Sequence, residues 1–338
     1  MSSGRHPRRR SVPPNEPCGA DDEALRTVVP GMRALIAIVG PTAVGKTDLA
    51  MALADRMAVE VVNADSRQVY RHMDIGTSKP SKDDRARVQH HLIDVASPDE
   101  DFSLATYLRL AKDAIEAVAT RGHIPLIVGG TGLYLWSLVE GWQVPEVPPD
   151  YEYRKSIEEI ASTQGSLSVH DELARIDAVA AARIHPRNLR RVIRALELFR
   201  ATGTLPSELL WRKGSVPAGS VIIGVGLDRS RLFARADARV DRMIGQGFPE
   251  EVKSLLNMGF SPSLPAMTSI GYREMVEHVL GKIDLETAVE QVKRETRRLI
   301  RRQHAWFRPS DERITWLDYV APAAALDDAA RIIEGVPR

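Results

Sequence analysis

The sequence predicts an α/β fold: a parallel sheet flanked by helices, as in phosphate-loop NTPases, with an all-helical insertion domain. Three observations predict it. In the first third of the chain, short apolar runs alternate with helical patterns, which is typical of right-handed crossovers in a parallel sheet. Residues 40–47 match G-x-x-x-x-G-K-[ST] directly after the first apolar run. From 151 to about 213 only helical patterns occur, before strand character returns.

The elements of the first part follow from the spacing of apolar residues. In the first helix Leu49, Leu53 and Met57 recur every four residues, and Ser103 can cap the second. Strands are predicted over 33–39, 59–63, 90–95 and 125–129, and helices over 46–57 and 103–120.

A Pro-rich stretch, 144–149, predicts a linker into the helical insertion. Gly203 is placed to end the last of these helices. The predicted helices of the insertion cover 153–161, 168–175, 178–184 and 188–201, and strands return at 221–225 and 313–317. We expect a disordered tail over 1–31, a core in two parts over 32–143 and 219–320, an insertion over 144–218, and a C-terminal helix or tail over 321–338. The second part of the core ends in a basic helix.

Composition excludes several classes of protein. The 338 residues carry 46 Lys+Arg against 45 Asp+Glu, so any basic surface is local. The single cysteine, Cys18, excludes an internal disulfide framework and a cysteine zinc site. No apolar run approaches the roughly 18 residues of a membrane span, and residues 1–31 lack the apolar core of a secretion signal. We therefore expect no membrane association and a cytoplasmic protein.

The segment Gly40-Pro-Thr-Ala-Val-Gly-Lys-Thr47 indicates a site for a di- or triphosphate group. Its two glycines let backbone N–H groups converge on one anion, and the following helix adds its positive end. Lys46 supplies a charge to the same oxygens, and the Thr47 hydroxyl can ligate Mg²⁺. The alternative, a glycine turn that matches by chance, is disfavoured because the motif lies between a strand and a helix.

Asp65 follows the second predicted strand, at the sheet edge that carries the phosphate loop. Three roles compete for it: metal ligand, general base, or cap of a following helix together with Ser66. An ordinary NTPase has an acidic metal partner at the end of a further strand. The strand over 125–129 ends in Gly-Thr-Gly instead, although Asp94 could supply an acid.

Two segments are rich in basic residues, although the chain as a whole is nearly neutral. Residues 183–200 hold six arginines and one acid, and residues 288–309 hold seven Lys/Arg and two acids. The second run ends with Trp306 and Phe307, of which we expect at least one in the core. Arginines hold phosphates and planar side chains stack on bases, so a nucleic-acid surface is favoured over a solvated face.

Seven motifs together resemble the bacterial tRNA dimethylallyltransferase (tRNA isopentenyltransferase) family over residues 33–317. They are GPTAVGKT at 40–47, NADSRQVYRHMDIGTSKP at 63–80, HHLID at 90–94, PLIVGGTGLY at 125–134, IHPRNLRRVIRALE at 184–197, IGYRE at 270–274 and RRQHAWFR at 301–308. At two motif positions this chain differs from the usual family pattern: Arg190 adds a positive charge there, and Arg301 keeps one.

The resemblance implies roles for individual residues. Asp65 is implied to be the general base, with Thr131 and Arg239 also catalytic. Gly40, Thr42, Ala43, Val44, Gly45, Lys46 and Thr47 are implied to hold a diphosphate, with Mg²⁺ on Thr47. The implied tRNA contacts are Asp65, Ser66, Arg67, Gln68, Thr131, Arg154, Arg190, Arg191, Arg194, Arg273, Arg301, Arg302, Gln303 and Arg308.

The resemblance also implies a reaction. A dimethylallyl group passes from dimethylallyl diphosphate to the exocyclic N6 of the adenosine on the 3′ side of the anticodon. The implied substrates are tRNAs that read codons starting with U, the partner is the anticodon stem-loop, and the enzyme is expected to act as a monomer. The alternatives are a prenyltransferase acting on free adenine nucleotide and a small-molecule kinase of the phosphate-loop type.

Overall fold

The computed structural model describes residues 34–209, 217 and 219–336. The tail expected over 1–31 lies outside the described residues. One sheet of six strands has the order β3-β2-β4-β1-β5-β6, and each neighbouring pair is parallel. The predicted parallel sheet is therefore confirmed. Its strands are β1 (Ile36–Val39), β2 (Val59–Asn63), β3 (His90–His91), β4 (Ile124–Gly129), β5 (Val221–Gly226) and β6 (Ile314–Asp318).

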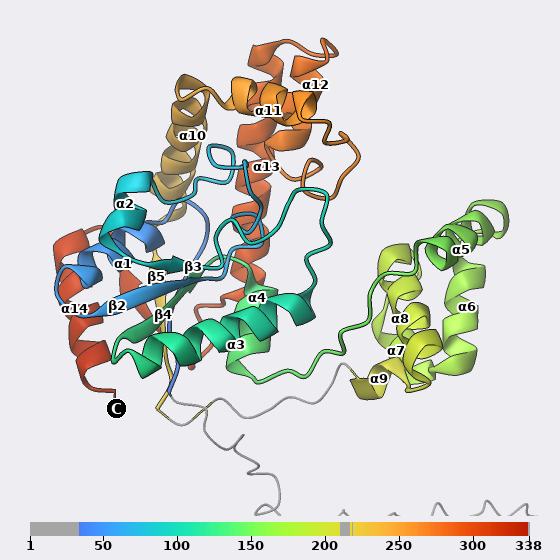
Figure 1. Cartoon of the computed structure of the whole chain (residues 1–338), viewed down its shortest axis with the longest axis horizontal. Helices are drawn as coiled ribbons and strands as arrows, with labels where there is room; N and C mark the ends of the chain where they lie inside the picture. The colour runs from blue at the N-terminus through green and yellow to red at the C-terminus, as the bar shows by residue number, and fades with distance from the viewer. Residues whose placement is uncertain (1–33, 210–216, 218, 337–338) are drawn as a thin grey trace, which may run out of the picture.

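Helices cover both faces of the sheet (Figure 1). In β1, Ile36 and Ile38 pack into the cluster on one face, whereas Ala37 and Val39 pack into the cluster on the other. This burial on both sides explains why the strands read as continuous apolar runs. The first face is covered by α1 (Lys46–Ala54) and α14 (Pro322–Glu334), and the second by α3 (Leu104–Thr120) and α4 (Gly132–Val139).

A third layer of helices lies beyond the carboxyl ends of the strands (Figure 1). Its apolar cluster includes Val69 and Met73 from the segment after β2, so this layer holds that segment against the sheet. The helices concerned are α10 (Arg229–Gly245), α11 (Phe248–Asn257), α12 (Tyr272–Val279) and α13 (Leu285–Trp306); the short α2 (Lys82–Arg87) precedes β3.

The predicted insertion forms a separate helical lobe, visible on the right of Figure 1. It has its own core, which includes Leu173, Val192 and Leu196. Gly203 lies in the left-handed region at φ 68° after α8, as expected for a C-cap. The lobe contains α5 (Tyr151–Gln164), α6 (Ser166–Ile176), α7 (Ala178–Arg183), α8 (Leu189–Thr202) and α9 (Pro206–Leu209). Residues 210–216 and 218 of the predicted insertion lie outside the described residues.

Two predicted elements are shorter than expected. The strand predicted over 90–95 is limited to His90–His91, because Leu92 and Asp94 turn the chain with φ values of 61° and 59°. The helix predicted over 46–57 ends at Ala54. In contrast, the Ser103 hydroxyl accepts the Thr106 N–H at 3.0 Å, which confirms the predicted cap. Within the described ranges, no helix is long and apolar enough to cross a membrane.

β2 carries a buried carboxylate, Glu60, which is 5% exposed. Arg121 donates to it from Nε at 3.0 Å and from Nη2 at 2.6 Å. The rings of His91 and His123 lie 2.7 and 2.8 Å from its oxygens. The hydrogen bonds from Arg121, followed by those from the two histidines, lower the pKa of Glu60 to about 2.

We expect Glu60→Gln to lower the free energy of unfolding by about 2 kcal/mol at pH 7, because it removes charge-assisted hydrogen bonds. Since the folded pKa is about 2 against the ordinary 4.5, this contribution is present above pH 4.5 and lost as the pH falls toward 2. Urea unfolding of the wild type and of Glu60→Gln at pH 7 and 3.5 measures this contribution to the free energy of unfolding. Exposed Glu158 provides the control variant Glu158→Gln. An equal difference between wild type and Glu60→Gln at both pH values contradicts the assignment.

Candidate active site

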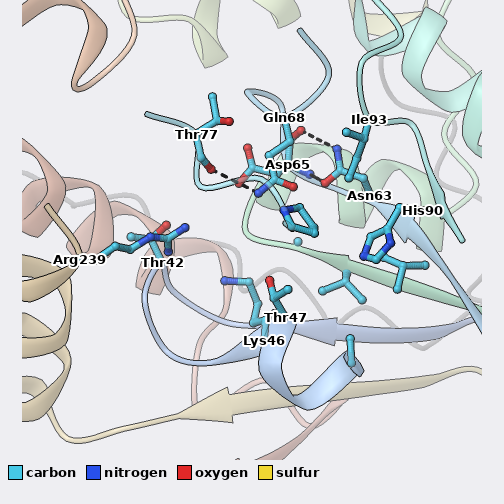
Figure 2. Close-up of a pocket in the computed structure, with 15 residues that line it drawn as sticks. Thr42, Lys46, Thr47, Asn63, Asp65, Gln68, Thr77, His90, Ile93 and Arg239 are labelled. Atoms are coloured by element: carbon cyan, nitrogen blue, oxygen red, sulfur yellow. Dashed lines mark hydrogen bonds between the residues drawn. The ribbon is translucent and has the colours of Figure 1, made fainter. Parts of the chain in front are cut away.

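A pocket opens at the carboxyl edge of the sheet, where β1, β2 and β4 end. Figure 2 shows Lys46 and Thr47 at the start of α1 on one side, Asp65 and Gln68 opposite them, and Arg239 entering from α10. This edge is where ligands bind in open α/β sheets. The pocket is lined by Thr42, Lys46, Thr47, Ala50, Val61, Asn63, Asp65, Gln68, Thr77, Pro80, His90, Ile93, Val128, Gly129 and Arg239.

The phosphate loop joins β1 to α1. Gly40 and Gly45 have φ values of 145° and 113°, and Ala43 also lies at a positive φ of 65°. The N–H groups from Ala43 to Thr47 donate to no acceptor within the described ranges. They remain available at the N-terminus of α1, which is a favourable position for an anion.

Two cations face the pocket from different elements. Lys46 Nζ donates to the Pro41 carbonyl at 2.8 Å, and Arg239 Nε donates to the Ser78 hydroxyl at 2.6 Å. Burial lowers the pKa of Lys46 to about 8, against the opposing effect of the Asp65 carboxylate. Burial likewise lowers the pKa of Arg239, and Asp65 again opposes the shift. Both cations therefore lack full compensation, and a bound anion would stabilise their charged forms.

Asp65 is fixed through its backbone by Asn63, whose side chain is buried at the end of β2. The Asn63 Oδ1 accepts the Asp65 N–H at 3.0 Å, and its Nδ2 donates to the Asp65 and Leu92 carbonyls at 3.1 and 3.0 Å. The Asp65 Oδ1 accepts the Arg67 N–H at 2.9 Å. No helix follows within the described segment, so the helix-cap alternative for Asp65 and Ser66 is wrong.

Thr131 lies after β4 and connects to the Asp65 segment. Its Oγ1 accepts the Ser66 N–H at 3.0 Å, and its own N–H donates to the Ala64 carbonyl at 3.1 Å. The structure thus joins Thr131 by hydrogen bonds to the two residues that flank Asp65 in the chain, Ala64 and Ser66.

The loop after Asp65 contains residues that sequence reasoning missed. Thr77 lines the pocket, and Ser78 receives Arg239. Gln68, expected to contact tRNA, donates its side-chain amide to the Thr77 and Ser78 carbonyls at 3.3 and 3.1 Å. The Glu251 carboxylate accepts N–H groups of residues 74–76 at 2.7 to 3.2 Å. Sequence gives no signal for Glu251, because its partners are far away in the chain.

The arginines among the expected tRNA contacts divide into those that make an ion pair and those that make none within the described residues. Arg154 and Arg194 both bind buried Glu197, Arg154 from Nε and Nη2 at 2.9 Å each, and Arg273 pairs with Glu274. Other expected contacts are exposed and make no ion pair within the described residues: Arg67, Arg190, Arg191, Arg301, Arg302 and Arg308.

Burial bears on three further expectations. Phe307 is fully buried and Trp306 is 41% exposed, so one aromatic residue of the pair is in the core. Asp94, considered as an NTPase acid, instead binds Lys79 and Arg85 at 2.5 and 2.6 Å and does not line the pocket. Gln303, expected to contact tRNA, is 7% exposed and bonds to two loops of the site.

The fold and the site define an α/β protein with a phosphate loop at the carboxyl edge of its parallel sheet and a carboxylate facing that loop. A family profile described as IPP transferase matches residues 68–310, and one described as isopentenyl transferase matches residues 33–98. The chain belongs to the IPP transferase family.

Individual relatives agree with this placement. A tRNA dimethylallyltransferase of Chloroflexus aggregans is 50% identical over 277 residues, covering 82% of this chain and 93% of the relative. A tRNA isopentenylpyrophosphate transferase structure from Bacillus halodurans matches with a TM-score of 0.66 at 39% identity, covering 90% of this chain and 96% of that one. A eukaryotic dimethylallyltransferase acting on tRNA matches with a TM-score of 0.74 at 27% identity, covering 90% and 81%.

A close approach between β2 and β4 gives a test of the site's framework. A Cβ on Gly129 would lie 2.1 Å from the Ala64 carbonyl oxygen. We expect Gly129→Ala to lower the free energy of unfolding by about 1–3 kcal/mol, because backbone on both sides must shift. Gly245→Ala is the matched control, since a Cβ there meets nothing within 4 Å. Urea unfolding of both variants compares them, and equal midpoints would contradict the close packing.

Proposed function

We propose that this chain transfers the dimethylallyl group of dimethylallyl diphosphate to the exocyclic N6 of the adenosine on the 3′ side of the anticodon. Its substrates are tRNAs that read codons starting with U, and diphosphate is released. The observation that carries the proposal is the pocket in which Asp65 faces Lys46, Arg239 and the phosphate loop. That arrangement provides a proton acceptor on one side and an anion site on the other.

The residues divide the reaction between them. The diphosphate lies on the loop formed by Gly40, Thr42, Ala43, Val44, Gly45, Lys46 and Thr47. As the allylic C–O bond breaks, its electron pair leaves with the diphosphate, whose growing charge the loop N–H groups, Lys46 and Arg239 stabilise. As the new C–N bond forms, the amine loses a proton to the Asp65 carboxylate. Thr131 holds the Asp65 segment through Ser66.

Mg²⁺ fits the chemistry of the pocket. It prefers oxygen ligands, and it is held in proteins by few side chains together with substrate phosphates. Thr47 and Asp65 line opposite sides of the pocket (Figure 2), so Thr47 would hold the ion beside the diphosphate. When bound, the ion would neutralise charge on the leaving group.

The helical lobe and the end of α13 favour tRNA over a free nucleotide. The lobe has a separate core and presents Arg190 and Arg191 without ion pairs inside the described chain. On α13, Arg301 and Arg302 are similarly exposed, and Trp306 offers a planar surface nearby. A base in an anticodon loop must unstack to reach a pocket, and these two basic surfaces would grip the loop while it does so. We propose that the enzyme works as a monomer in the cytoplasm, where tRNA is found.

The transfer assay supplies radiolabelled dimethylallyl diphosphate and Mg²⁺ together with either unmodified tRNA or AMP. Label is expected in tRNA only, beside the anticodon. Label in AMP alone would favour the free-nucleotide alternative, and consumption of ATP with no transfer would favour the kinase alternative.

Asp65→Asn and Asp65→Ala are expected to lower kcat by about 10²–10⁴-fold, because the proton acceptor is removed. The Kd for tRNA, measured by filter binding, should change by less than about twofold. Asp55→Asn serves as a control, since Asp55 lies at the other end of α1 and pairs with Arg87. A collapse of tRNA binding with kcat preserved at saturating tRNA would remove the general-base assignment.

The double variant Arg190→Ala, Arg191→Ala is expected to weaken tRNA binding and leave kcat at saturating tRNA unchanged. The slope of log K against log salt should fall by about 0.7 for each single-strand phosphate that the protein no longer neutralises. Arg331→Ala on α14, where Arg331 pairs with Asp328, provides the control. An unchanged salt slope would mean that these arginines are solvent-exposed and do not contact tRNA phosphates.

A further inference from the structure

The side chain of Gln303 lies in the interior of the molecule although it belongs to the basic end of α13. It is 7% exposed, whereas its neighbours Arg301, Arg302 and His304 are exposed. A side chain buried to this degree offers little surface to a macromolecule. Its role must be sought in the groups that it contacts.

Both polar atoms of Gln303 are used, and each binds a different loop of the pocket. The Oε1 accepts the Thr42 N–H at 2.8 Å, and the Nε2 donates to the Gly130 carbonyl at 3.0 Å. Thr42 belongs to the loop after β1 and Gly130 to the loop after β4, and these strands are neighbours in the sheet. One side chain therefore spans the two loops that frame the pocket.

The contact at Gly130 leaves no spare room. A Cβ on Gly130 would lie 2.6 Å from the Gln303 Nε2, which is closer than packed atoms tolerate. An amide can also accept from an N–H at one end and donate to a carbonyl at the other while remaining neutral. Glutamine therefore supplies both groups that this position uses, an acceptor for the Thr42 N–H and a donor to the Gly130 carbonyl.

The hydrogen bond from the Thr42 N–H to Gln303 uses none of the following N–H groups of the phosphate loop. The N–H groups from Ala43 to Thr47 keep no acceptor within the described ranges, so Gln303 anchors the base of the loop without occupying its cradle. On the other side, Gly130 precedes Thr131, which holds the Asp65 segment through Ala64 and Ser66. Hydrogen bonds thus link the phosphate loop through Gln303 to Gly130, and the next residue in the chain, Thr131, is hydrogen-bonded to Ala64 and Ser66 on either side of Asp65.

We propose that Gln303 is a positioning residue, not a tRNA contact, and that it sets the separation between the phosphate loop and the Thr131–Asp65 segment. The inference rests on the proposed function, in which the leaving diphosphate and the attacking amine occupy these two sides. Transfer needs the two reacting atoms about 3–3.5 Å apart and aligned, and a misplacement of about 1 Å can cost about a hundredfold in rate. Because α13 also carries Arg301 and Arg302, the same helix joins the proposed tRNA surface to the reacting groups.

Gln303→Met and Gln303→Glu test the inference, because each lacks the donor to the Gly130 carbonyl. Both are expected to lower kcat about 10- to 100-fold at saturating substrates, while the Kd for tRNA changes by less than about twofold. The affinity for inorganic diphosphate with Mg²⁺, measured in the absence of tRNA, should fall. Gln291→Met, on the same helix and with no side-chain hydrogen bond in the described chain, is the control. Thermal unfolding identifies the folded fraction to which each kcat refers.

Two further variants separate the outcomes. Arg302→Ala is expected to show the reverse pattern, with weaker tRNA binding and unchanged diphosphate affinity. If the Gln303 variants behave like Arg302→Ala, or if kcat and diphosphate affinity stay at the wild-type level, the inference is overturned. If Gln303→Met does not fold, Gln303→Glu decides, since it keeps the volume and the acceptor toward Thr42. Lys46→Ala tests the proposed function separately. If this variant keeps the wild-type affinity for diphosphate, the assignment of the phosphate loop as the diphosphate site is overturned.

Discussion

The parallel register of β1, β4 and β2 is the constraint on which the site depends. Val39 pairs with Gly129 and Asn63 with Val128, so the three strands end side by side. The phosphate loop, Thr131 and Asp65 each follow one of these ends. The residues that follow these strands lie at the same edge of the sheet, because the strands are parallel, and their side chains can therefore reach one pocket. The close contact of Gly129 with Ala64 then holds the β4 and β2 ends at a short distance.

Charge in the pocket is organised around one carboxylate and two cations from distant parts of the chain. Burial makes the charged forms of Lys46 and Arg239 less favourable, and Asp65 compensates only in part. The protein therefore keeps a local excess of positive character on one side of the pocket. The buried carboxylate of Glu60, in contrast, has direct partners in Arg121, His91 and His123. The two pocket cations and Glu60 therefore differ in how far neighbouring charges compensate their burial.

The parts of the site that sequence could predict are those set by local chain geometry. The phosphate loop and Asp65 lie within a few residues of strand ends, so strand prediction places them at one edge. The roles of Ser78, Glu251 and Gln303 could not be predicted in this way. Their partners lie 161 residues away for Ser78, 175–177 for Glu251, and 173 and 261 for Gln303. These contacts depend on how the third layer of helices packs.

The same limit explains where a local sequence pattern and the structure differ. The basic segment 183–200 predicts exposed arginines, but Arg194 on α8 turns to buried Glu197, which also holds Arg154. The apolar run over 90–95 reads as a strand, yet the backbone turns at Leu92 and Asp94. In both cases tertiary contacts override a local pattern, as is common for short runs.

The helical lobe lies in the chain between β4 and β5. Strand β5 pairs with β1 from Ile36–Val221 onward, and just before the strands the Leu35 N–H donates to the Ser220 hydroxyl, 185 residues away. On the ribosome, β1, β2 and β4 are therefore complete well before β5 exists. The edge of β1, with its buried run from Ile36 to Val39, stays unpaired while the lobe is made, for several seconds at about 5–20 residues per second. Unpaired apolar edges are sites of mispairing. The lobe has local contacts and can fold during this interval. Its length and its position in the chain therefore set how long the edge of β1 is open to mispairing during synthesis.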